Sequence, residues 1–202
     1  MPGSTEVADV TDPERPARRT GGRSARVQDQ VEGAALAVLL DAGYSGLTIR
    51  AVAQAAGVAE TTVYRRWPTV GDLAAAALLR LAARGNPIPD TGSLVEDLRL
   101  LLTQVTELLA RPEVLRVVRS AVVAEGDAAR HARNAFFQQR FAASSVIVER
   151  AIARGELPPD TDGLRLIESL VGPAYMRALF GYREIDDDFV ESSIASVLAT
   201  VR

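Results

Sequence analysis

The sequence contains no cysteine and few aromatic residues. Without cysteine, the chain can form neither a disulfide framework nor a thiolate metal site, and it has no thiol nucleophile. Aromatic residues make up 5% of the chain and hydrophobic residues 48%, so the core must consist largely of alanine, leucine and valine. A core of that kind favours packed helices over aromatic-rich sheets. The composition therefore predicts an all-α fold.

Long apolar runs are also missing. No run approaches the roughly 18 residues needed to span a bilayer, because Ser, Arg, Glu or Gly interrupts each one. Residues 1–25 lack the apolar centre of a signal peptide. We therefore expect a soluble, cytoplasmic protein that has no membrane partner.

Signatures of enzymes and metal sites are absent as well. The sequence has no Gly-x-Ser-x-Gly elbow, no P-loop and no Gly-x-Gly-x-x-Gly loop. The single histidine, His131, lies between Arg130 and Arg133, whose charges would repel a metal ion or a proton. Three consecutive aspartates at 186–188 suit the start of a helix, where the helix dipole stabilises carboxylates. We expect no catalytic residue, no metal site, no cofactor and no enzymatic activity.

Basic charge is carried by arginine alone and gathers near the N-terminus. All 23 basic residues are arginine, although the net charge of the chain is -3. The stretch between Glu14 and Asp29 contains no acid and five arginines, namely Arg15, Arg18, Arg19, Arg23 and Arg26. Because phosphate attraction is screened over about 8 to 10 Å, a local patch is sufficient for contact with nucleic acid. Residues 1–24, which also contain several prolines and glycines, are predicted to form a disordered basic arm.

Apolar residues recur at helical spacing through the rest of the chain. A first helix is expected from Val27 until Gly43 ends it. Further helices are predicted over residues 48–56, 60–67, 69–83, 93–110, 112–124, 127–154, 161–180 and 187–201. Thr69 and Ser93 each open a capping-box pattern. The predicted architecture is a small helix-turn-helix domain, residues 25–70, joined by a linking helix to a larger C-terminal helical bundle within residues 71–202.

The helices predicted at 48–56 and 60–67 are joined by a tight turn at Gly57 and form the helix-turn-helix. Buried Val63 sets the phase of the second helix, so its polar residues face away from the core. Threonine and arginine can bond base edges in a major groove, and a tyrosine hydroxyl can reach phosphate. Thr48, at the start of the first helix, offers a hydroxyl and an adjacent backbone N–H to phosphate.

Residues 47–58 (LTIRAVAQAAGV), 61–68 (TTVYRRWP) and 72–73 (DL) carry a resemblance to a known family. They resemble the DNA-binding domain of tetracycline-repressor-like (TetR-type) transcriptional regulators over about residues 26–80. The resemblance implies contact with double-stranded DNA through Arg23, Arg26, Thr48, Arg50, Thr61, Thr62, Tyr64, Arg65, Arg66 and Trp67.

The resemblance also implies a role for each of these residues. Thr48 and Arg50 would touch phosphate or sugar, while Thr61, Thr62 and Arg65 would face bases. The tyrosine and the tryptophan would anchor the DNA backbone. The arginines of the arm would follow phosphates or enter the adjacent minor groove.

Two positions depart from the family pattern. Ala59 stands where a serine usually caps the recognition helix, and Val70 stands where a lysine usually opens the next helix. Loss of the cap should cost roughly 0.5 to 2 kcal/mol of local helix stability. These departures and the acidic balance of the chain motivate a second hypothesis, a helical small-molecule-binding or adaptor protein with a weakened DNA-binding head.

The end of the chain is similar to the C-terminal part of TetR-type regulators, in which the last two helices form the four-helix bundle of a dimer. The resemblance rests on Gly172, Pro173, Ala174, Tyr175 and Arg177, with a final helix after them. Two apolar stripes are assigned to homodimerisation, namely Leu164, Ile167, Val171, Ala174 and Ala178, and then Val190, Ile194 and Val197. The alternative is that these stripes are buried inside one monomer.

The resemblance finally implies a pocket in the larger domain for an unidentified small-molecule effector. Its candidate lining residues are Gln104, Phe137, Gln138, Phe141, Glu168 and Tyr175. An effector would change the separation of two DNA-binding heads. The predicted function is a ligand-responsive repressor that binds a palindromic operator as a homodimer.

Overall fold

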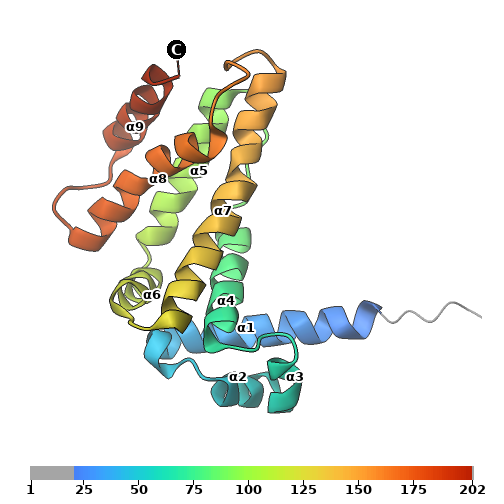
Figure 1. The fold of residues 1–202 in the computed structure, drawn as a ribbon. Helices are drawn as coiled ribbons and strands as arrows, with labels where there is room; N and C mark the ends of the chain where they lie inside the picture. The colour runs from blue at the N-terminus through green and yellow to red at the C-terminus, as the bar shows by residue number, and fades with distance from the viewer. Residues whose placement is uncertain (1–20, 202) are drawn as a thin grey trace, which may run out of the picture.

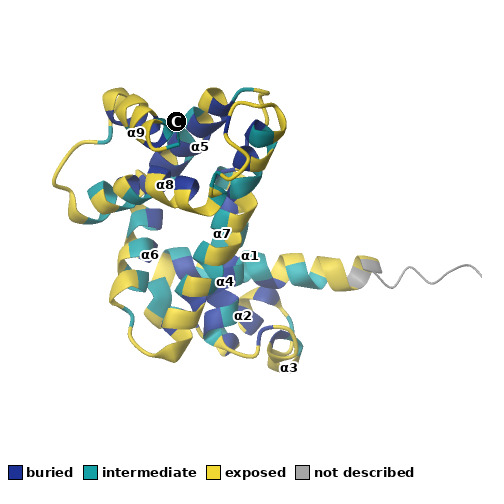
Figure 2. Ribbon diagram, turned by 45° about the horizontal axis from the view of Figure 1, so that its top comes forward, coloured by how far each residue is buried: buried dark blue, intermediate teal, exposed yellow. Residues whose placement is uncertain are grey.

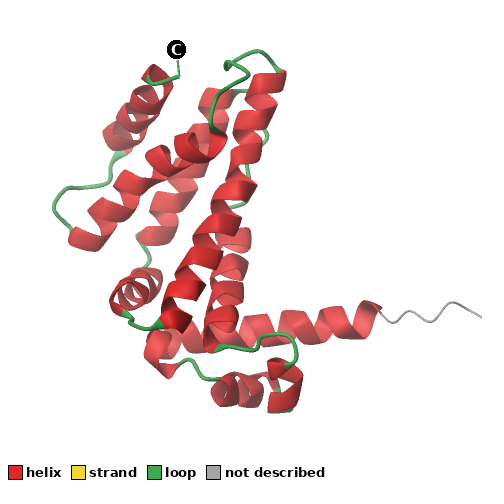
Figure 3. Ribbon diagram, viewed as in Figure 1, coloured by secondary structure: helices red, strands yellow, loops and turns green. Residues whose placement is uncertain are grey.

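A computed structural model describes residues 21–201, so residues 1–20 of the arm predicted at residues 1–24 lie outside the described part of the chain. Within that part the protein consists of helices and short connections, without strands (Figure 3). The helices are α1 (Gly21–Gly46), α2 (Ile49–Ala56), α3 (Glu60–Tyr64), α4 (Val70–Gly85), α5 (Leu94–Leu109), α6 (Pro112–Val123), α7 (Asp127–Ala153), α8 (Gly163–Phe180) and α9 (Asp187–Ala199). The predicted all-α fold is confirmed. Every helix between residues 21 and 201 is too short or too polar to be a candidate for crossing a bilayer.

Helix α1 begins earlier than expected. It starts at Gly21 and not at Val27, so residues 21–24 are helical and the prediction that they belong to a disordered arm is wrong. The segment 23–26 contains no proline, and Ala25 and Arg26 are good helix formers. Gly43, where the helix was expected to stop, has φ 68° and ψ -172° and kinks α1 before a last turn. Only glycine adopts such a backbone conformation at little cost.

An N-terminal core holds α1, α2, α3 and the first half of α4 together. Its fully buried side chains include Val31, Leu39, Val52, Val63 and Leu73. The same cluster takes in one valine of α6 and one alanine of α7. The core of the helix-turn-helix unit therefore extends past the boundary predicted at residue 70.

A second core lies at the other end of the molecule, among α5, the second half of α7, α8 and α9 (Figure 2). Six of the eight predicted dimer residues are buried in it, namely Ile167, Val171, Ala174, Val190, Ile194 and Val197. Ala178 is half-buried against the same core, and only Leu164 is exposed. For the six buried residues the assignment to a dimer interface is therefore wrong, because they are covered inside one monomer. For Leu164 and Ala178 it stays a prediction. The leucines of α5 cover the stripes, as this Leu-rich helix packs on both α8 and α9.

Helices α4 and α7 connect the two ends. Figure 1 shows them side by side between the helix-turn-helix unit and the C-terminal helices, and they form the most extensive helix pair in the described structure. Arg80 of α4 is ion-paired with Asp29 of α1 and lies 4.0 Å from Glu32. Through α4, the N-terminal unit is thus fixed to the body of the protein.

The helix caps test the local predictions. The Thr69 hydroxyl accepts a hydrogen bond from the Asp72 backbone N–H at 3.1 Å, and Asp72 accepts one from the Thr69 N–H at 3.0 Å, so this capping box is confirmed. The capping box predicted at Ser93 is wrong, because the Ser93 side chain caps nothing. Glu156, which follows α7, accepts the hydrogen bond from the Leu94 N–H at 2.8 Å. At α9 the three aspartates stand at the helix start as expected, and Asp186 also caps the helix by accepting a hydrogen bond from the Phe189 N–H.

Candidate nucleic-acid interface and ligand cavity

The turn between α2 and α3 sets the shape of the candidate interface. Thr48 caps α2, and its hydroxyl accepts a hydrogen bond from the Ala51 N–H at 3.0 Å. Gly57 ends α2 in the left-handed conformation with φ 63°, which directs the chain into α3. These two residues fix both ends of α2, so the position of α3 relative to it follows from local geometry.

Helix α3 is shorter than the sequence predicted. It ends at Tyr64 and not at Trp67, because the N–H groups of Arg66 and Trp67 both donate to the Val63 carbonyl in a tightened last turn. The residue before α3, Ala59, makes no side-chain cap. Val63 is fully buried and holds α3 against the N-terminal core. Glu60, Thr61 and Tyr64 are left on its outer side.

Most of the predicted DNA-binding residues lie on the surface of this unit. On α3 and the turn after it, Thr61, Tyr64, Arg65 and Arg66 are exposed, with Tyr64 at 53%, whereas Thr62 is half-buried. Thr48, Arg50 and Arg26 are exposed on the neighbouring elements. The Arg23 side chain lies outside the described part of the structure. In Figure 1, α2 and α3 lie at the end of the molecule farthest from α9.

Trp67 does not belong to this surface. It is 6% exposed and packs in the N-terminal core with Val63 and Leu73. Its predicted role as an anchor on the DNA backbone is therefore corrected to a packing role. The Arg66 guanidinium lies 5.8 Å from the centre of the indole ring, close enough for a cation–π interaction.

The arginines of the candidate interface are not neutralised by acids of the described structure. Arg26, Arg50, Arg65 and Arg66 take part in no ion pair and no side-chain hydrogen bond within residues 21–201. Arginine presents five N–H donors that match phosphate oxygens and the guanine edge. Although the chain is acidic overall, this surface offers uncompensated positive charge.

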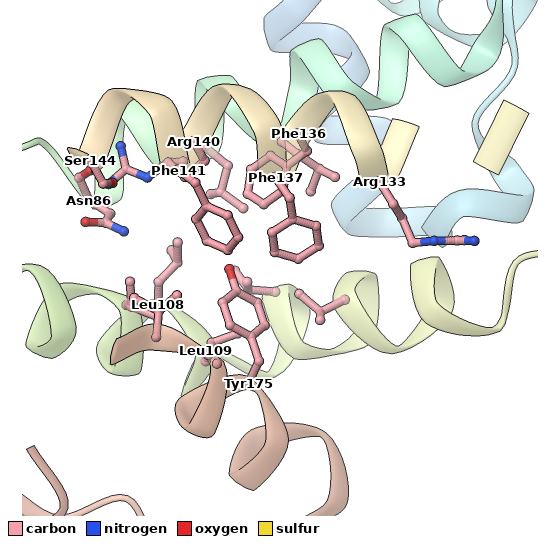
Figure 4. Close-up of a pocket in the computed structure, with 18 of the residues that line it drawn as sticks. Asn86, Leu108, Leu109, Arg133, Phe136, Phe137, Arg140, Phe141, Ser144 and Tyr175 are labelled. Atoms are coloured by element: carbon pink, nitrogen blue, oxygen red, sulfur yellow. The ribbon is translucent and has the colours of Figure 1, made fainter. Parts of the chain in front are cut away.

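A cavity of about 410 Å³ lies in the larger part of the protein, between α4, α5, α6, α7 and α8. Its wall is mainly apolar and includes an aromatic cluster (Figure 4). Phe137 is central in that cluster, with ring centroids 5.1 Å from Phe136, 5.5 Å from Phe141 and 5.6 Å from Tyr175. The size and the apolar wall are typical of a small-molecule site.

Four of the six predicted pocket residues line this cavity: Phe137, Phe141, Glu168 and Tyr175. Gln138 is exposed on α7, because the residue after Phe137 is turned about 100° away from the cavity. Gln104 of α5 is half-buried but does not line the cavity. These two assignments are corrected.

The cavity wall also contains five residues that were not predicted from the sequence, namely Asn86, Arg133, Phe136, Arg140 and Ser144. Arg133, Arg140 and Ser144 stand four residues before, three after and seven after Phe137 on the same helix. That spacing places residues on one helix face, so it was the signal that could have found them. Asn86 follows α4 and gave no local signal.

The polar groups of the cavity differ in how they are satisfied. Arg133 donates to the Ala121 and Ala124 carbonyls at 2.6 and 2.9 Å. Arg140 donates a hydrogen bond to the Asn86 carbonyl. Burial lowers the pKa of its guanidinium, and the nearby Tyr175 opposes this shift. Burial raises the pKa of Tyr175 to about 12, and the positive charge of Arg140 opposes this. Tyr175 is therefore a neutral hydrogen-bond donor at neutral pH.

Comparison with known proteins agrees with this geometry. Residues 33–77 match the family described as "Bacterial regulatory proteins, tetR family", and residues 88–197 match "Tetracyclin repressor-like, C-terminal domain". The chain is 32% identical over 191 residues to the HTH-type transcriptional regulator AqdR of Rhodococcus erythropolis, covering 94% of this chain and 92% of that protein. Over 102 residues it is 34% identical to the HTH-type transcriptional repressor KstR of Rhodococcus jostii, covering 48% of each.

Solved structures show the same arrangement of helices. The TetR family transcription regulator SCO0332 is similar with a TM-score of 0.74 and 29% identity, covering 88% of this chain and 99% of that one. The fold is shared with tylp, a TetR regulator from Streptomyces fradiae, at a TM-score of 0.61 and 24% identity, covering 89% and 88% of the two chains. The chain therefore belongs to the TetR family and is a DNA-binding transcriptional regulator.

Proposed function

We propose that this regulator is a repressor that binds a palindromic operator as a homodimer and leaves the DNA when a small molecule occupies the cavity. The observation that carries the proposal is the physical connection between the two sites. One helix, α4, lines the cavity with its C-terminal half and packs with its N-terminal half in the core that holds α3.

On the DNA side, each exposed residue has a chemical role. Thr61, Thr62 and Arg65 contact base edges in the major groove, and Arg66 contacts phosphate. Thr48 accepts the Ala51 N–H but keeps its own hydroxyl proton, which it can donate to phosphate. Tyr64 and Arg50 contact the backbone beside these positions. The arginines at 23 and 26, near the start of α1, supply the salt-dependent part of the affinity.

On the ligand side, α4 is the element that transmits binding. Its C-terminal half contributes Leu78, Leu81 and Ala82 to the cavity wall, while Leu73 and Ala77 of its N-terminal half lie in the N-terminal core. A ligand that shifts the first group therefore moves the second. To empty the operator, the ligand needs to bind the non-binding conformation better by only a few kcal/mol.

A homodimer accounts for how a recognition helix of this size selects a site. One short helix reads few bases, whereas two helices related by a two-fold axis read a palindrome. The outward faces of α8 and α9 are the proposed contact surface. Met176 and Phe180 are exposed on α8, and α9 presents small residues such as Ala195 and Ser196. This outward surface of α8 and α9 replaces the two buried stripes as the proposed dimer interface.

The DNA part of the proposal is tested by a mobility-shift assay over the DNA flanking the gene. We expect a specific band whose affinity decreases steeply as salt rises, because each phosphate contact releases counterions. Scrambled DNA of equal length is the control. The absence of a salt-sensitive specific band would contradict the proposal and favour the adaptor hypothesis.

The dimer part is tested by sedimentation analysis of the full chain. We expect Ala195→Glu to give a monomer with weakened operator binding, because it places like charges across the proposed two-fold axis. Val95→Glu, on an exposed position of α5, should remain dimeric. A dimer that survives Ala195→Glu unchanged would place the contact elsewhere.

A further inference from the structure

The cavity has an unusual charge at one end. Arg140, on α7, takes part in no ion pair with an acid of residues 21–201. Its one hydrogen bond goes to the backbone carbonyl of Asn86, which leaves most of its five N–H donors for other partners. A half-buried cation without a counter-charge is costly unless an anion joins it.

The second arginine of the wall does not share this property. The Arg133 guanidinium donates hydrogen bonds to two carbonyls at the C-terminal end of α6, where the helix dipole compensates its charge. In Figure 4 the Arg133 and Arg140 side chains extend toward opposite ends of the cavity. The one carboxylate of the wall, Glu168, is exposed to solvent. Arg140 is thus the uncompensated charge of the lining.

Neutral donors accompany Arg140. Tyr175 keeps its proton at neutral pH, and its hydroxyl is directed toward the phenylalanines of α7 in Figure 4. Asn86 and Ser144 lie at the same end as the Arg140 guanidinium. A cation beside hydroxyl and amide groups matches an oxyanion such as a carboxylate.

The remainder of the wall favours a flat ring. Phe136, Phe137, Phe141 and Tyr175 form a continuous set of edge-to-face and tilted contacts. Aromatic rings in such arrangements add favourable interactions beyond the area that they bury, which an aliphatic chain does not provide. Much of the remaining lining is aliphatic, with leucines of α4 and α5.

We propose that the cavity binds a flat aromatic molecule with one acidic group, held with its oxyanion at Arg140 and its ring against the phenylalanines of α7. This inference rests on the proposed function only in taking the cavity as the effector site. It adds the chemical class of the effector, an aromatic organic acid, and the residue that selects it.

The test measures binding of 2-naphthoate to the full chain by calorimetry. Its uncharged relative 2-naphthamide reports the contribution of the charge, and decanoate reports that of the ring. We expect 2-naphthoate to bind at least about ten-fold more tightly than either, the size of effect of one charged hydrogen-bonded contact. No binding of 2-naphthoate, or equally tight binding of 2-naphthamide, would overturn the inference that the ligand carries an acidic group. If decanoate binds as tightly as 2-naphthoate, the inference that the ligand carries an aromatic ring would be overturned.

Variants assign the preference to a residue. Arg140→Met should lose the preference for 2-naphthoate over 2-naphthamide, and Arg140→Lys should keep part of it. Arg133→Met is the matched control, because its charge is already used by α6, and it should keep the preference. If Arg140→Met fails to fold, as judged by circular dichroism, the Lys variant and Tyr175→Phe still decide. Full preference in Arg140→Met would overturn the assignment, as would full preference in both Arg140→Lys and Tyr175→Phe where Arg140→Met does not fold.

Failure of the inference and failure of the proposed function are distinguishable. If 2-naphthoate binds in an Arg140-dependent manner but does not release operator DNA, the class of ligand stands and the repressor switch fails. If a different molecule releases the DNA and 2-naphthoate does not bind, the switch stands and the inferred class is wrong.

Discussion

Gly71 of α4 lies directly against the backbone of Ala128 in α7. A Cβ atom on Gly71 would stand 2.4 Å from the Ala128 carbonyl oxygen. Because the obstacle is backbone, the clash cannot be relieved by rotating a side chain. The first turns of the two connecting helices are therefore in contact that only glycine permits.

Gly71→Ala should separate α4 from α7 and destabilise the protein. Overpacking of this kind typically costs about 1 to 3 kcal/mol, measurable as a lower unfolding free energy in urea. The matched control is Gly33→Ala in α1, where a Cβ would have ordinary contacts of 3.6 Å or more. That change should be neutral or stabilising, since alanine is favoured in helix interiors by roughly 0.5 to 1 kcal/mol. Equal effects of the two substitutions would contradict the tight contact.

The cap of α5 should depend on Glu156 and not on Ser93. Glu156→Ala removes the acceptor of the Leu94 N–H and should lower the unfolding free energy by about 0.5 to 2 kcal/mol, as for other lost caps. Ser93→Ala should cost less, because its side chain accepts no hydrogen bond from the helix. Urea unfolding of both variants checks the order, and the reverse order would refute the cap.

Ala59→Ser should stabilise the recognition helix, α3. A serine hydroxyl at this position can accept a backbone N–H that α3 leaves uncapped, a gain of about 0.5 to 2 kcal/mol in local helix stability. Fluorescence anisotropy with operator DNA should show tighter binding. Ala55→Ser, at an exposed position in the last turn of α2, serves as the control and should leave affinity unchanged. An Ala59→Ser variant with wild-type affinity and stability would show that the cap does not limit binding.

Arg65 and Arg66 should divide specificity from general affinity. Arg65→Ala should relax the preference at one base position, at a cost of about 1 to 3 kcal/mol, while Arg66→Ala should weaken all sequences alike and reduce the salt dependence. Competition binding with single-base operator variants separates the two effects. Identical losses on matched and scrambled DNA for both variants would argue against this division.

Tyr175 should make stability depend on pH in the alkaline range. Its pKa rises from 10.0 to about 12 on folding because burial disfavours the phenolate. The folded state therefore holds this proton more tightly, so its contribution is fully present below pH 10 and is lost as the pH rises toward about 12. Phenolate absorbance during an alkaline titration should lose its late component in Tyr175→Phe. A titration with the late component intact would assign it to another tyrosine.

Sequence patterns predicted the features whose partners are near in the chain. The capping box of Thr69 and Asp72 spans four residues, and it is present. The box at Ser93 has the same pattern but fails, because Glu156 reaches the helix start from a distant part of the chain. Local pattern contains no information about such a competitor.

The same limit explains the dimer stripes and part of the cavity. The spacing of Ile167 and Val171 shows that they are covered, but not whether α5 or a second protomer covers them. In the cavity, Phe137 and Phe141 were predictable from helical spacing, and Arg140 lies on the same face. Asn86 comes from another helix end, and only the folded chain brings it to that face.

Burial of the α8 and α9 stripes beneath α5 has a consequence for how the protein is made. Obligate dimers have no stable folded monomer, because each copy completes the other's core. Here each copy closes its C-terminal core with its own helices. Folding can thus finish before two copies meet, so the rate of refolding should not depend on protein concentration. In the proposed homodimer, partners should therefore exchange without unfolding.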